Sequence, residues 1–412
     1  MRRLCHQTRF LLILGLAILA RSASGQVAAR PRIVEPLILG DQRVVVVMID
    51  GFGKDYLDES RMPVLKGLMA RGFSKTVHAV MPSVTNVNNA SIACGVWPLE
   101  HGITGNSFFD ETKGDAEYME NAAYLRCPTI FQRAAERGLK SALLTAKKKT
   151  VALLSRGAEV AIAAEAPSAE EIRRYGPPPP IYSREINYWL WEVAIDLLKN
   201  HPELRLVYVH TTDYPMHTWP PSAPESKEHL ARLDALIGRA VAAAPDAAFL
   251  ITADHGLNAK TRCWDLAKAC KNRGLELRYA LSAERDRYVK HHRTFGGTAW
   301  VWLKSPGDVP RATEIIRRLQ GVEGVIPRAE AARRFRLMPE RIGDLMVLGD
   351  KETVFGETEG EVETLPSTFR THGSLHETEI PLIIYNASGT LPVAAEVLNN
   401  FDLTRNLYRD PR

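Results

Sequence analysis

Runs of apolar, β-branched residues alternate along the chain with segments of helical periodicity. The run at 44–49 is continuously apolar, which is typical of a strand that is buried on both faces, and 204–210 and 247–252 are further apolar strands. Helical patterns cover residues 63–71 and 184–199. This alternation predicts an α/β fold, a parallel sheet with helices on both of its faces. Further predicted elements are strands at 141–145 and 381–385 and a helix at 130–137.

The composition and the predicted element pattern of the sequence change after residue 256. Charged residues become dense, and a strand–helix–strand pattern occupies 298–303, 311–319 and 324–326. This pattern predicts a smaller α+β cap that is inserted into the main domain. The predicted organisation is a main domain in two parts, residues 43–256 and 371–412, with the inserted cap at 257–370.

The first 25 residues have the pattern of a secretory signal peptide. Three arginines accompany an apolar run at 10–20, and small residues follow at 22–25. The run is too short to span a bilayer comfortably. We expect a signal peptide at 1–25 and an exported protein, periplasmic or secreted. An uncleaved N-terminal anchor is the alternative.

Composition describes an ordinary soluble globular protein with a mildly basic surface. Hydrophobic residues make up 45% of the chain and charged residues 25%. The formal net charge is +5, and no long run of lysine or arginine is present, so the sequence has no nucleic-acid-binding signature. No second membrane segment follows the signal peptide. The expected partner is a small anionic molecule, and a homodimer is compatible with the sequence.

Four cysteines follow the predicted signal peptide. Exported proteins can form disulfides, and the short spacing of Cys263 and Cys270 suggests a small bridged loop, although the pairing cannot be read from sequence. The others are Cys94 and Cys127, and no CxxC pair occurs, so a thiolate zinc site is not expected.

Acidic residues stand at the ends of three predicted strands. Asp50 follows the first, Asp213 lies shortly after the second, and Asp254 with His255 follows the third. Ligands of open α/β sheets bind at the carboxyl ends of the strands, so these side chains should converge. Clustered carboxylates repel one another and are costly to bury unless cations lie among them. Carboxylates with imidazoles suit zinc, although other first-row metals share these ligands.

Two further histidines extend this set. His217 stands four residues after Asp213, which places both on one face of a helical turn, and His372 lies in Thr371-His372-Gly373. Asp50 alone is more typical of a turn or helix cap, and a capping Asp with a surface His would give the spacing of Asp213 and His217. Asp254-His255-Gly256 directly after a strand is more specific. The four motifs together predict a bound pair of metal ions.

The segment at 81–89 is rich in hydroxyl and amide side chains and supplies a candidate nucleophile. Metal coordination can lower the pKa of a hydroxyl group and generate an alkoxide near neutral pH. Chemistry alone does not separate Ser83 from Thr85, and the same composition is typical of a helix start. Asn106 offers a side-chain amide in a later loop.

Lys147 and Lys149 follow the predicted strand at 141–145. In an extended segment, residues two apart point to the same side, so both ammonium groups would face one place and Lys148 would face away. From the residues alone, a solvated basic loop is the simpler interpretation.

The order of these motifs resembles the alkaline phosphatase superfamily, in the branch of nucleotide pyrophosphatases/phosphodiesterases. Within that branch the motifs are most similar to the phosphonoacetate hydrolases. The resemblance extends from about residue 43 to residue 386 and includes the predicted cap. It rests on Met-Pro-Ser-x-Thr-Asn-x-Asn-Asn at 81–89, His-Gly-Ile-x-Gly-Asn-x-Phe-x-Asp at 101–110, Thr-Thr-Asp-Tyr at 211–214 and Ala-Asp-His-Gly-x-Asn-Ala-Lys at 253–260.

The resemblance implies two zinc ions and a threonine nucleophile, Thr85. Asn106 and the backbone amide of Thr85 would bind a phosphoryl oxygen, and Lys147 and Lys149 would bind the anionic end of the substrate. His376 is a further candidate ligand, and His210 is expected to pack or to bond locally. The implied ligands of one zinc are Asp213, His217 and His372, and those of the other are Asp50, Thr85, Asp254 and His255. His291 and His292 either approach the substrate or are solvated.

The implied reaction is the hydrolysis of phosphonoacetate to acetate and phosphate. Thr85 would attack phosphorus in line, and water would then hydrolyse the phosphothreonine. Cleavage of the P–C bond expels a carbanion, so cations beside the carboxylate would stabilise charge that grows in the transition state. The signal peptide and Trp219 depart from the phosphonoacetate hydrolases, which leaves a phosphodiesterase or nucleotide pyrophosphatase as the alternative, with Trp219 or Phe108 beside a base. A non-catalytic exported binding protein of the same fold is the third reading.

Overall fold

A computed structural model describes residues 39, 42–287, 293–389, 391 and 394–409. The predicted signal peptide at 1–25 lies outside the described residues, as do His291 and His292. In the described part of the chain, no helix combines the length and the apolar character that a membrane span requires.

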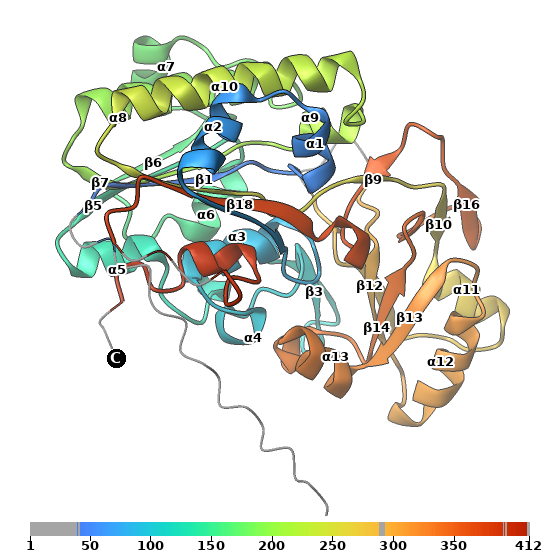
Figure 1. Ribbon diagram of the computed structural model, residues 1–412. Helices are drawn as coiled ribbons and strands as arrows, with labels where there is room; N and C mark the ends of the chain where they lie inside the picture. Colours follow the sequence, from blue (N-terminus) through green and yellow to red (C-terminus); the bar gives the residue numbers. More distant parts are fainter. Residues whose placement is uncertain (1–38, 40–41, 288–292, 390, 392–393, 410–412) are drawn as a thin grey trace, which may run out of the picture. The chain divides into compact units, whose positions relative to one another are not determined.

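A seven-stranded sheet forms the centre of the fold, in the order β2–β18–β8–β1–β7–β5–β6 (Figure 1). β1 pairs in parallel with β7 and β8, and Met48 lies opposite His210 and Thr252. β18 runs antiparallel to both of its neighbours. The predicted α/β sheet is confirmed, with one strand reversed. The strands are β1 (Val44–Met48), β2 (Phe73–His78), β5 (Lys140–Thr145), β6 (Val160–Ala163), β7 (Leu204–His210), β8 (Ala248–Thr252) and β18 (Glu379–Tyr385).

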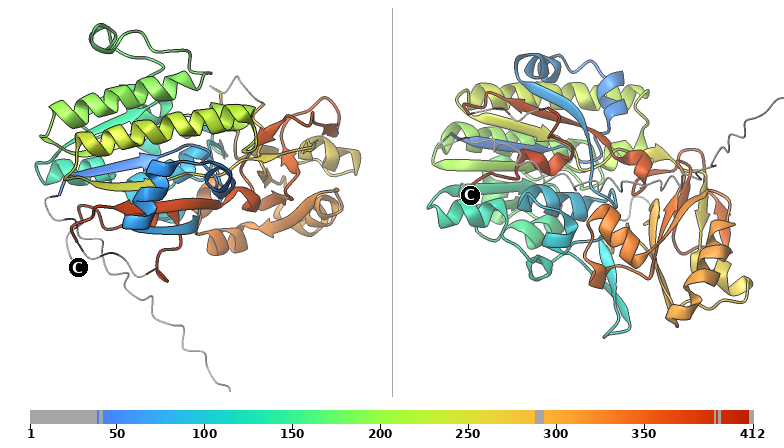
Figure 2. Two further views of the ribbon diagram at one scale, coloured as in Figure 1. Left: turned by 45° about the horizontal axis from the view of Figure 1, so that its top comes forward. Right: turned by 60° about the horizontal axis from the view of Figure 1, so that its bottom comes forward.

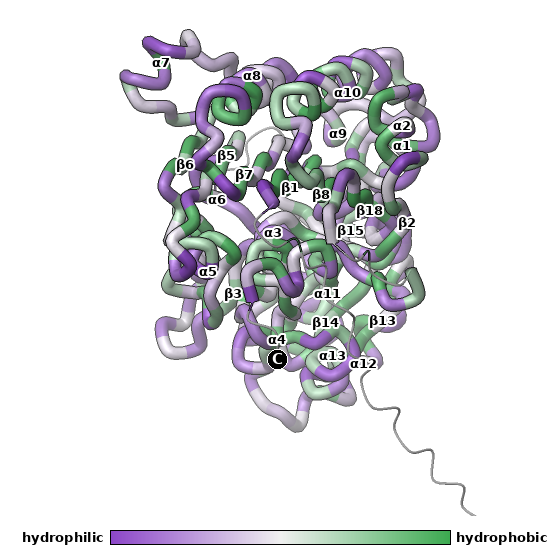
Figure 3. The backbone as a smooth tube through the Cα atoms, turned by 60° about the vertical axis from the view of Figure 1, so that its left-hand side comes forward, coloured by the Kyte–Doolittle hydropathy of each residue, from purple (hydrophilic) through white to green (hydrophobic). Residues whose placement is uncertain are grey.

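Helices cover both faces of this sheet, which explains why its central strands are continuously apolar. All five residues of β1 and all five of β8 are buried. α2 (Pro63–Arg71), α8 (Glu185–Asn200) and α10 (Pro224–Ala243) lie on one face (Figures 1 and 2). α3 (Thr85–Cys94), α5 (Ile130–Glu136) and α6 (Lys148–Leu154) lie on the other (Figure 2). Figure 3 shows the central strands as hydrophobic, whereas the outlying α7 (Ala169–Tyr175), which buries no residue, is largely hydrophilic.

The chain between β8 and β18 forms a separate antiparallel sheet in the order β11–β12–β14–β13. β12 (Thr298–Trp302), α12 (Val309–Arg317) and β13 (Val322–Pro327) form the predicted strand–helix–strand unit, and β14 (Leu345–Gly349) lies between its two strands. β12 and β13 are therefore parallel but not adjacent, which is a split βαβ arrangement. The α+β character of this region is confirmed; the boundaries at 257 and 370 stay a prediction.

The remaining elements are short. They are α1 (Lys54–Glu59), α4 (Pro98–His101), β3 (Ser107–Asp110), β4 (Asp115–Tyr118), α9 (Tyr214–Thr218), β9 (Asn258–Ala259), β10 (Arg262–Trp264), α11 (Leu266–Asn272), β11 (Tyr279–Ser282), α13 (Arg328–Phe335), β15 (Thr353–Phe355), β16 (Val362–Thr364) and β17 (Arg370–Thr371).

The suggested bridge between Cys263 and Cys270 is wrong for this structure, in which both are free buried thiols. Cys263 in β10 packs with Phe295 and Val354, whereas Cys270 in α11 belongs to the core beneath α12. The two side chains are directed into different apolar clusters, so their short spacing in sequence does not bring them together.

One buried histidine in α10 makes stability depend on pH. His229 is buried beside the hydroxyl of Tyr188, 3.0 Å from its Nδ1, and burial lowers its pKa from 6.5 to about 3. The unfolded state therefore binds more protons below pH 6.5, so the free energy of unfolding falls as pH decreases from 6.5 toward 3. Between pH 6.5 and 5, this residue should contribute a loss of roughly 2 kcal/mol.

Urea unfolding of the wild type and of His229→Gln at pH 7 and pH 5 checks this expectation. The variant should lose less stability than the wild type over this interval. Equal losses in the two proteins would show that His229 is not the group that titrates.

Candidate active site

The acidic residues that follow β1, β7 and β8 converge at the carboxyl edge of the sheet. Asp50, Asp213 and Asp254 are all buried. The backbone N–H of Asp50 donates to Oγ1 of Thr211 (2.9 Å), and that of Gly51 donates to Oδ1 of Asp254 (3.0 Å). Adjacent strand ends are therefore tied together by hydrogen bonds that also orient the carboxylates.

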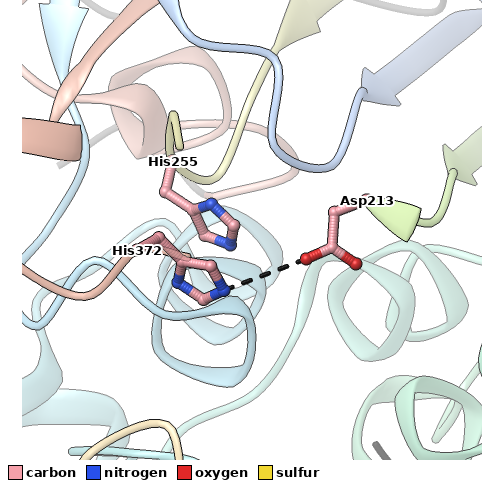
Figure 4. A group of neighbouring side chains, drawn as sticks. All are labelled: Asp213, His255 and His372. Carbon is pink, nitrogen blue, oxygen red and sulfur yellow. Dashed lines mark ion pairs between the residues drawn. The ribbon is translucent and has the colours of Figure 1, made fainter. Parts of the chain in front are cut away.

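Two overlapping groups of side chains have donor atoms close enough to share a metal ion. Asp50, Asp254 and His255 form one, and Asp213, His255 and His372 form the other (Figure 4); within each group the donor atoms lie within 4.8 Å of one another. His217 lies beside the second group, with its Nε2 2.9 Å from Oδ2 of Asp213.

The first group coincides with the carboxylate and imidazole ligands predicted for one zinc. The second differs from the prediction because His255 takes the place of His217. The rings of His255 and His372 are stacked, with centroids 3.5 Å apart, whereas those of His217 and His372 are 5.4 Å apart. His255 therefore lies between the two groups in this structure.

The unpaired donor atoms at this site fit metal ligation. Among the described side chains, Oδ1 of Asp50, Oδ2 of Asp254 and Nε2 of His372 are buried without a hydrogen-bond partner. Nδ1 of each imidazole faces a backbone carbonyl instead: Ser83 for His372 (2.8 Å), Arg370 for His217 (2.7 Å) and Gly256 for His255 (3.1 Å). Backbone carbonyls commonly orient metal-ligating histidines in this way, leaving Nε2 for the metal.

The electrostatics of the site also favour bound cations. Burial and the nearby Asp50 raise the pKa of Asp254 well above its ordinary value. Burial opposes ionisation of Asp213, but Lys147 and His217 outweigh it and hold the pKa of Asp213 well below its usual range. Burial, helped by His255, lowers the pKa of His372, which keeps its imidazole neutral. Metal ligation requires neutral imidazoles and ionised carboxylates. A bound cation would offset the repulsion between carboxylates that raises the pKa of Asp254.

Lys147 already places one cation in this cluster. Its Nζ donates to Oδ2 of Asp50 (2.7 Å) and to Oδ1 of Asp213 (2.9 Å), one carboxylate from each side of the site. Lys149 pairs with Asp286 instead. The two lysines therefore face neighbouring but different carboxylates, because Lys147 caps α6 in an extended conformation and Lys149 lies within the helix. Lys148 is exposed, as predicted.

Thr85 stands at the first position of α3, where unpaired backbone N–H groups favour an anion. Its Oγ1 lies 3.3 Å from Nε2 of His255. Oδ1 of Asn106 accepts a hydrogen bond from the backbone N–H of Asn86 (3.3 Å), which joins the Asn106 loop to the same helix start. Ser83 is directed elsewhere, since its hydroxyl donates to the carbonyl of Ser374.

Three groups that position the site were not identified from the sequence. The amide of Asn187 in α8 clamps the backbone of Thr212, next to Asp213, through bonds of 3.0 and 2.8 Å. The fully buried pair of Lys260 and Glu377 (2.7 Å) ties the segment after β8 to the turn that follows His372. The Lys260 position lies in the 253–260 motif, so that motif could have indicated this role; Asn187 and Glu377 stand in no motif.

Glu284 is the third missed group, and it comes from the inserted region. Its Oε2 accepts a hydrogen bond from Nδ2 of Asn106 (3.0 Å), and its Oε1 lies 3.6 Å from Nε2 of His372. Burial raises the pKa of this carboxyl well above its ordinary value. Glu284 therefore joins the predicted phosphoryl-binding amide to the predicted metal site.

The other histidines and aromatic residues have separate environments. His210 is buried and bonds locally, 3.2 Å from Asp50 and 3.0 Å from Thr145, as predicted. His376 pairs with Glu323 (2.8 Å) at the surface, away from both metal groups. Trp219 packs edge-on against Tyr214, and Phe108 packs edge-on against Tyr124.

A cavity of about 710 Å³ lies beside Lys149. Its lining combines the aromatic rings of Tyr118 and Tyr124 with charged groups that include Glu120 and Arg287. A second cavity, of about 700 Å³, lies among β10, β11 and β12 and is lined by none of the predicted site residues. Lys149 is thus the predicted substrate-binding residue that faces a described cavity.

Comparison with known proteins places these motifs in a family. The model of the type I phosphodiesterase / nucleotide pyrophosphatase family matches residues 44–375. The structure is similar to phosphonoacetate hydrolase from Sinorhizobium meliloti 1021 in complex with phosphonoacetate, with a TM-score of 0.80 and 29% identity over 90% of this chain and 96% of that one. The resemblance predicted from the motifs is confirmed.

More distant relatives share the fold or part of the sequence. Murine ectonucleotide pyrophosphatase/phosphodiesterase 5 is 16% identical with a TM-score of 0.64, covering 88% of this chain and 93% of that one, which is a likeness of fold. Venom phosphodiesterase from Naja atra is 25% identical over 231 residues, which is 52% of this chain. The matched part spans only 26% of that venom protein.

Proposed function

Because the chain belongs to the type I phosphodiesterase / nucleotide pyrophosphatase family, we propose that it is a metal-dependent hydrolase in which Thr85 attacks phosphorus. One observation carries the proposal: Thr85, at a helix N-terminus, lies 3.3 Å from His255, which belongs to both buried groups of metal-ligand type. We further propose that the metals are two zinc ions, held by Asp50, Asp254 and His255 and by Asp213, His217 and His372.

Two bound zinc ions would act as Lewis acids and lower the pKa of the Thr85 hydroxyl. In the first step Oγ1 of Thr85 forms a bond to phosphorus, and the bond from phosphorus to the leaving group breaks in line with it. The side-chain amide of Asn106 and the N-terminus of α3 donate to the phosphoryl oxygens, whose negative charge they stabilise. Water then attacks the phosphothreonine, and phosphate leaves as the hydroxyl of Thr85 is restored.

For the substrate we propose a phosphonate of the phosphonoacetate type. The P–C bond breaks, its electron pair moves to carbon, and protonation from water gives acetate. Support comes from the 29% identity to a phosphonoacetate hydrolase over 90% of the chain. Lys147 contacts Asp50 of the metal site, and Lys149 lines the cavity; ammonium groups at these places can stabilise the developing enolate.

A phosphodiester is the second candidate, and the cavity beside Lys149 favours it. About 710 Å³ is far more than acetate requires, and Tyr118 and Tyr124 offer aromatic surface to a larger leaving group. Under either reading the partner is a small anionic molecule. From the sequence pattern at 1–25 we also propose export to the periplasm or the medium.

The experiment offers zinc-loaded protein phosphonoacetate and bis(p-nitrophenyl) phosphate side by side, with a chelated control. We expect phosphate and acetate from phosphonoacetate, lost on chelation and strongly reduced in Lys147→Ala and Lys149→Ala. Lys140→Ala is the matched control, because this lysine is exposed, pairs with Glu159 and is not part of the cavity lining, so the rate should be unchanged. If the diester is cleaved quickly and phosphonoacetate is not cleaved, the proposed metal site stands and the assignment of a phosphonate substrate is rejected. A loaded protein that cleaves neither compound would reject the hydrolase itself.

A further inference from the structure

Three of the four charged residues at 284–287, in the segment after β11, pair with a residue from the other side of the site. Glu284 accepts from Asn106 (3.0 Å), Asp286 pairs with Lys149, and Arg287 pairs with Glu120 (3.0 Å). All three belong to the inserted region, whereas their partners belong to the main domain. This segment therefore helps to determine which charges a substrate meets beside the metal groups.

The pair formed by Lys149 and Asp286 is buried on both sides. The side chain of Lys149 is 6% exposed and that of Asp286 is 0% exposed. An ammonium group with such a partner carries a compensated charge, so an incoming anion meets a nearly neutral pair. Lys147 is also paired, with Asp50 and Asp213. The chain thus supplies carboxylates to both of the lysines that the proposed reaction uses.

We propose that Asp286 is an internal counter-ion that the carboxylate of a substrate must displace from Lys149. The inference rests on the proposed function, and it names the residue that sets selectivity between carboxylate-bearing phosphonates and phosphonates without a carboxylate. Two carboxylates at one buried ammonium group repel each other. Asp286 therefore weakens the binding of every ligand that places a carboxylate at Lys149. A ligand without a carboxylate does not compete with Asp286, so its Kd does not depend on Asp286.

The position of Lys149 explains why the substrate carboxylate competes with Asp286 for Lys149 and not for Lys147. Lys149 lines the cavity of about 710 Å³ together with Glu120 and Arg287. Lys147 lies between the aspartates of the two metal groups and is not part of that lining. In the proposed binding pose, phosphorus lies at Thr85 and the organic part lies in the cavity, so that the carboxylate meets Lys149.

Titration calorimetry on the zinc-loaded full chain tests the proposal without requiring turnover. Phosphonoacetate and methylphosphonate are compared in Thr85→Ala, which should bind substrate without turning it over, and in Thr85→Ala combined with Asp286→Asn, whose amide oxygen still accepts from Lys149. The Kd of phosphonoacetate should fall about tenfold in the double variant because the competing charge is gone, with the Kd of methylphosphonate unchanged. Glu159→Gln is the control: it removes a carboxylate that pairs with Lys140 (3.1 Å) and is not part of the cavity lining, and it should alter neither Kd.

Three results would overturn the proposal. The Kd of phosphonoacetate could stay constant or rise in Asp286→Asn, in which case Asp286 positions Lys149 rather than competing for it. Both ligands could bind more tightly by the same factor, or Glu159→Gln could match Asp286→Asn, and either result would indicate a general effect of charge. Asp286→Ser serves if the asparagine variant does not fold. Failure of the hydrolase proposal is seen separately, as absent turnover in the zinc-loaded wild type.

Discussion

Replacing Thr85 with alanine should abolish turnover while the protein keeps its fold and its metal ions. The hydroxyl is the proposed nucleophile, and removing such a group from an active site costs on the order of 10⁴ to 10⁶ in rate. The side chain is buried at the start of α3, and the one described hydrogen bond of its hydroxyl is with His255, so the loss of the hydroxyl should leave the packing intact. The measurement is kcat for the better substrate, together with the zinc content of the purified variant.

Ser83→Ala is the matched control for this prediction. Ser83 is also buried and lies two residues away, but its hydroxyl donates to the carbonyl of Ser374 and does not face either metal group. We expect this variant to retain most of its activity. An active Thr85→Ala enzyme beside an inactive Ser83→Ala enzyme would assign the nucleophile to Ser83.

Replacing His372 with alanine should remove one of the two proposed metal ions and most of the activity. The imidazole is fully buried, held by the carbonyl of Ser83 through Nδ1, and its Nε2 has no hydrogen-bond partner among the described residues. If Nε2 ligates zinc, the zinc content should fall from two per chain toward one. Loss of that ion would remove several kcal/mol of transition-state stabilisation, which is on the order of 10³ in rate.

His376→Ala provides the control, because His376 lies four residues further on and pairs with Glu323 at the surface. Zinc content by elemental analysis and kcat are measured for both variants. We expect His376→Ala to match the wild type in both. Full zinc content in His372→Ala, or an equal loss in His376→Ala, would contradict the assignment of ligands.

The sequence predicted the site best where acidic residues directly follow predicted strands. Asp50, Asp213 and Asp254 could be predicted to converge because each follows a largely apolar strand, and such strands lie in the interior of a parallel sheet. β2 was not predicted, because it lies at the sheet edge and only one of its six residues is buried. The reversed direction of β18 could not be predicted either, since a buried strand has the same apolar pattern in both directions.

The partners of the predicted lysines could not be read from the sequence. Asp286 meets Lys149 across 137 residues of chain, and Glu284 meets Asn106 across 178. Contacts of this kind depend on how an inserted segment returns to the main sheet, which local patterns do not encode. The dense charge after β11 was visible, but charge on an insertion is more often solvated than buried. The wrong suggestion for Cys263 and Cys270 has a similar origin, since nearness in the chain says nothing about the direction of two side chains.

The most direct test of the central claim is to trap the covalent intermediate. Zinc-loaded enzyme is mixed with its best substrate and quenched with acid at successive early times, and its peptides are mapped by mass spectrometry. We expect a phosphoryl adduct on Thr85 that appears before product accumulates and is absent from the chelated protein and from Thr85→Ala. An adduct on another residue, or product formation at full rate by Thr85→Ala, would contradict nucleophilic attack by Thr85.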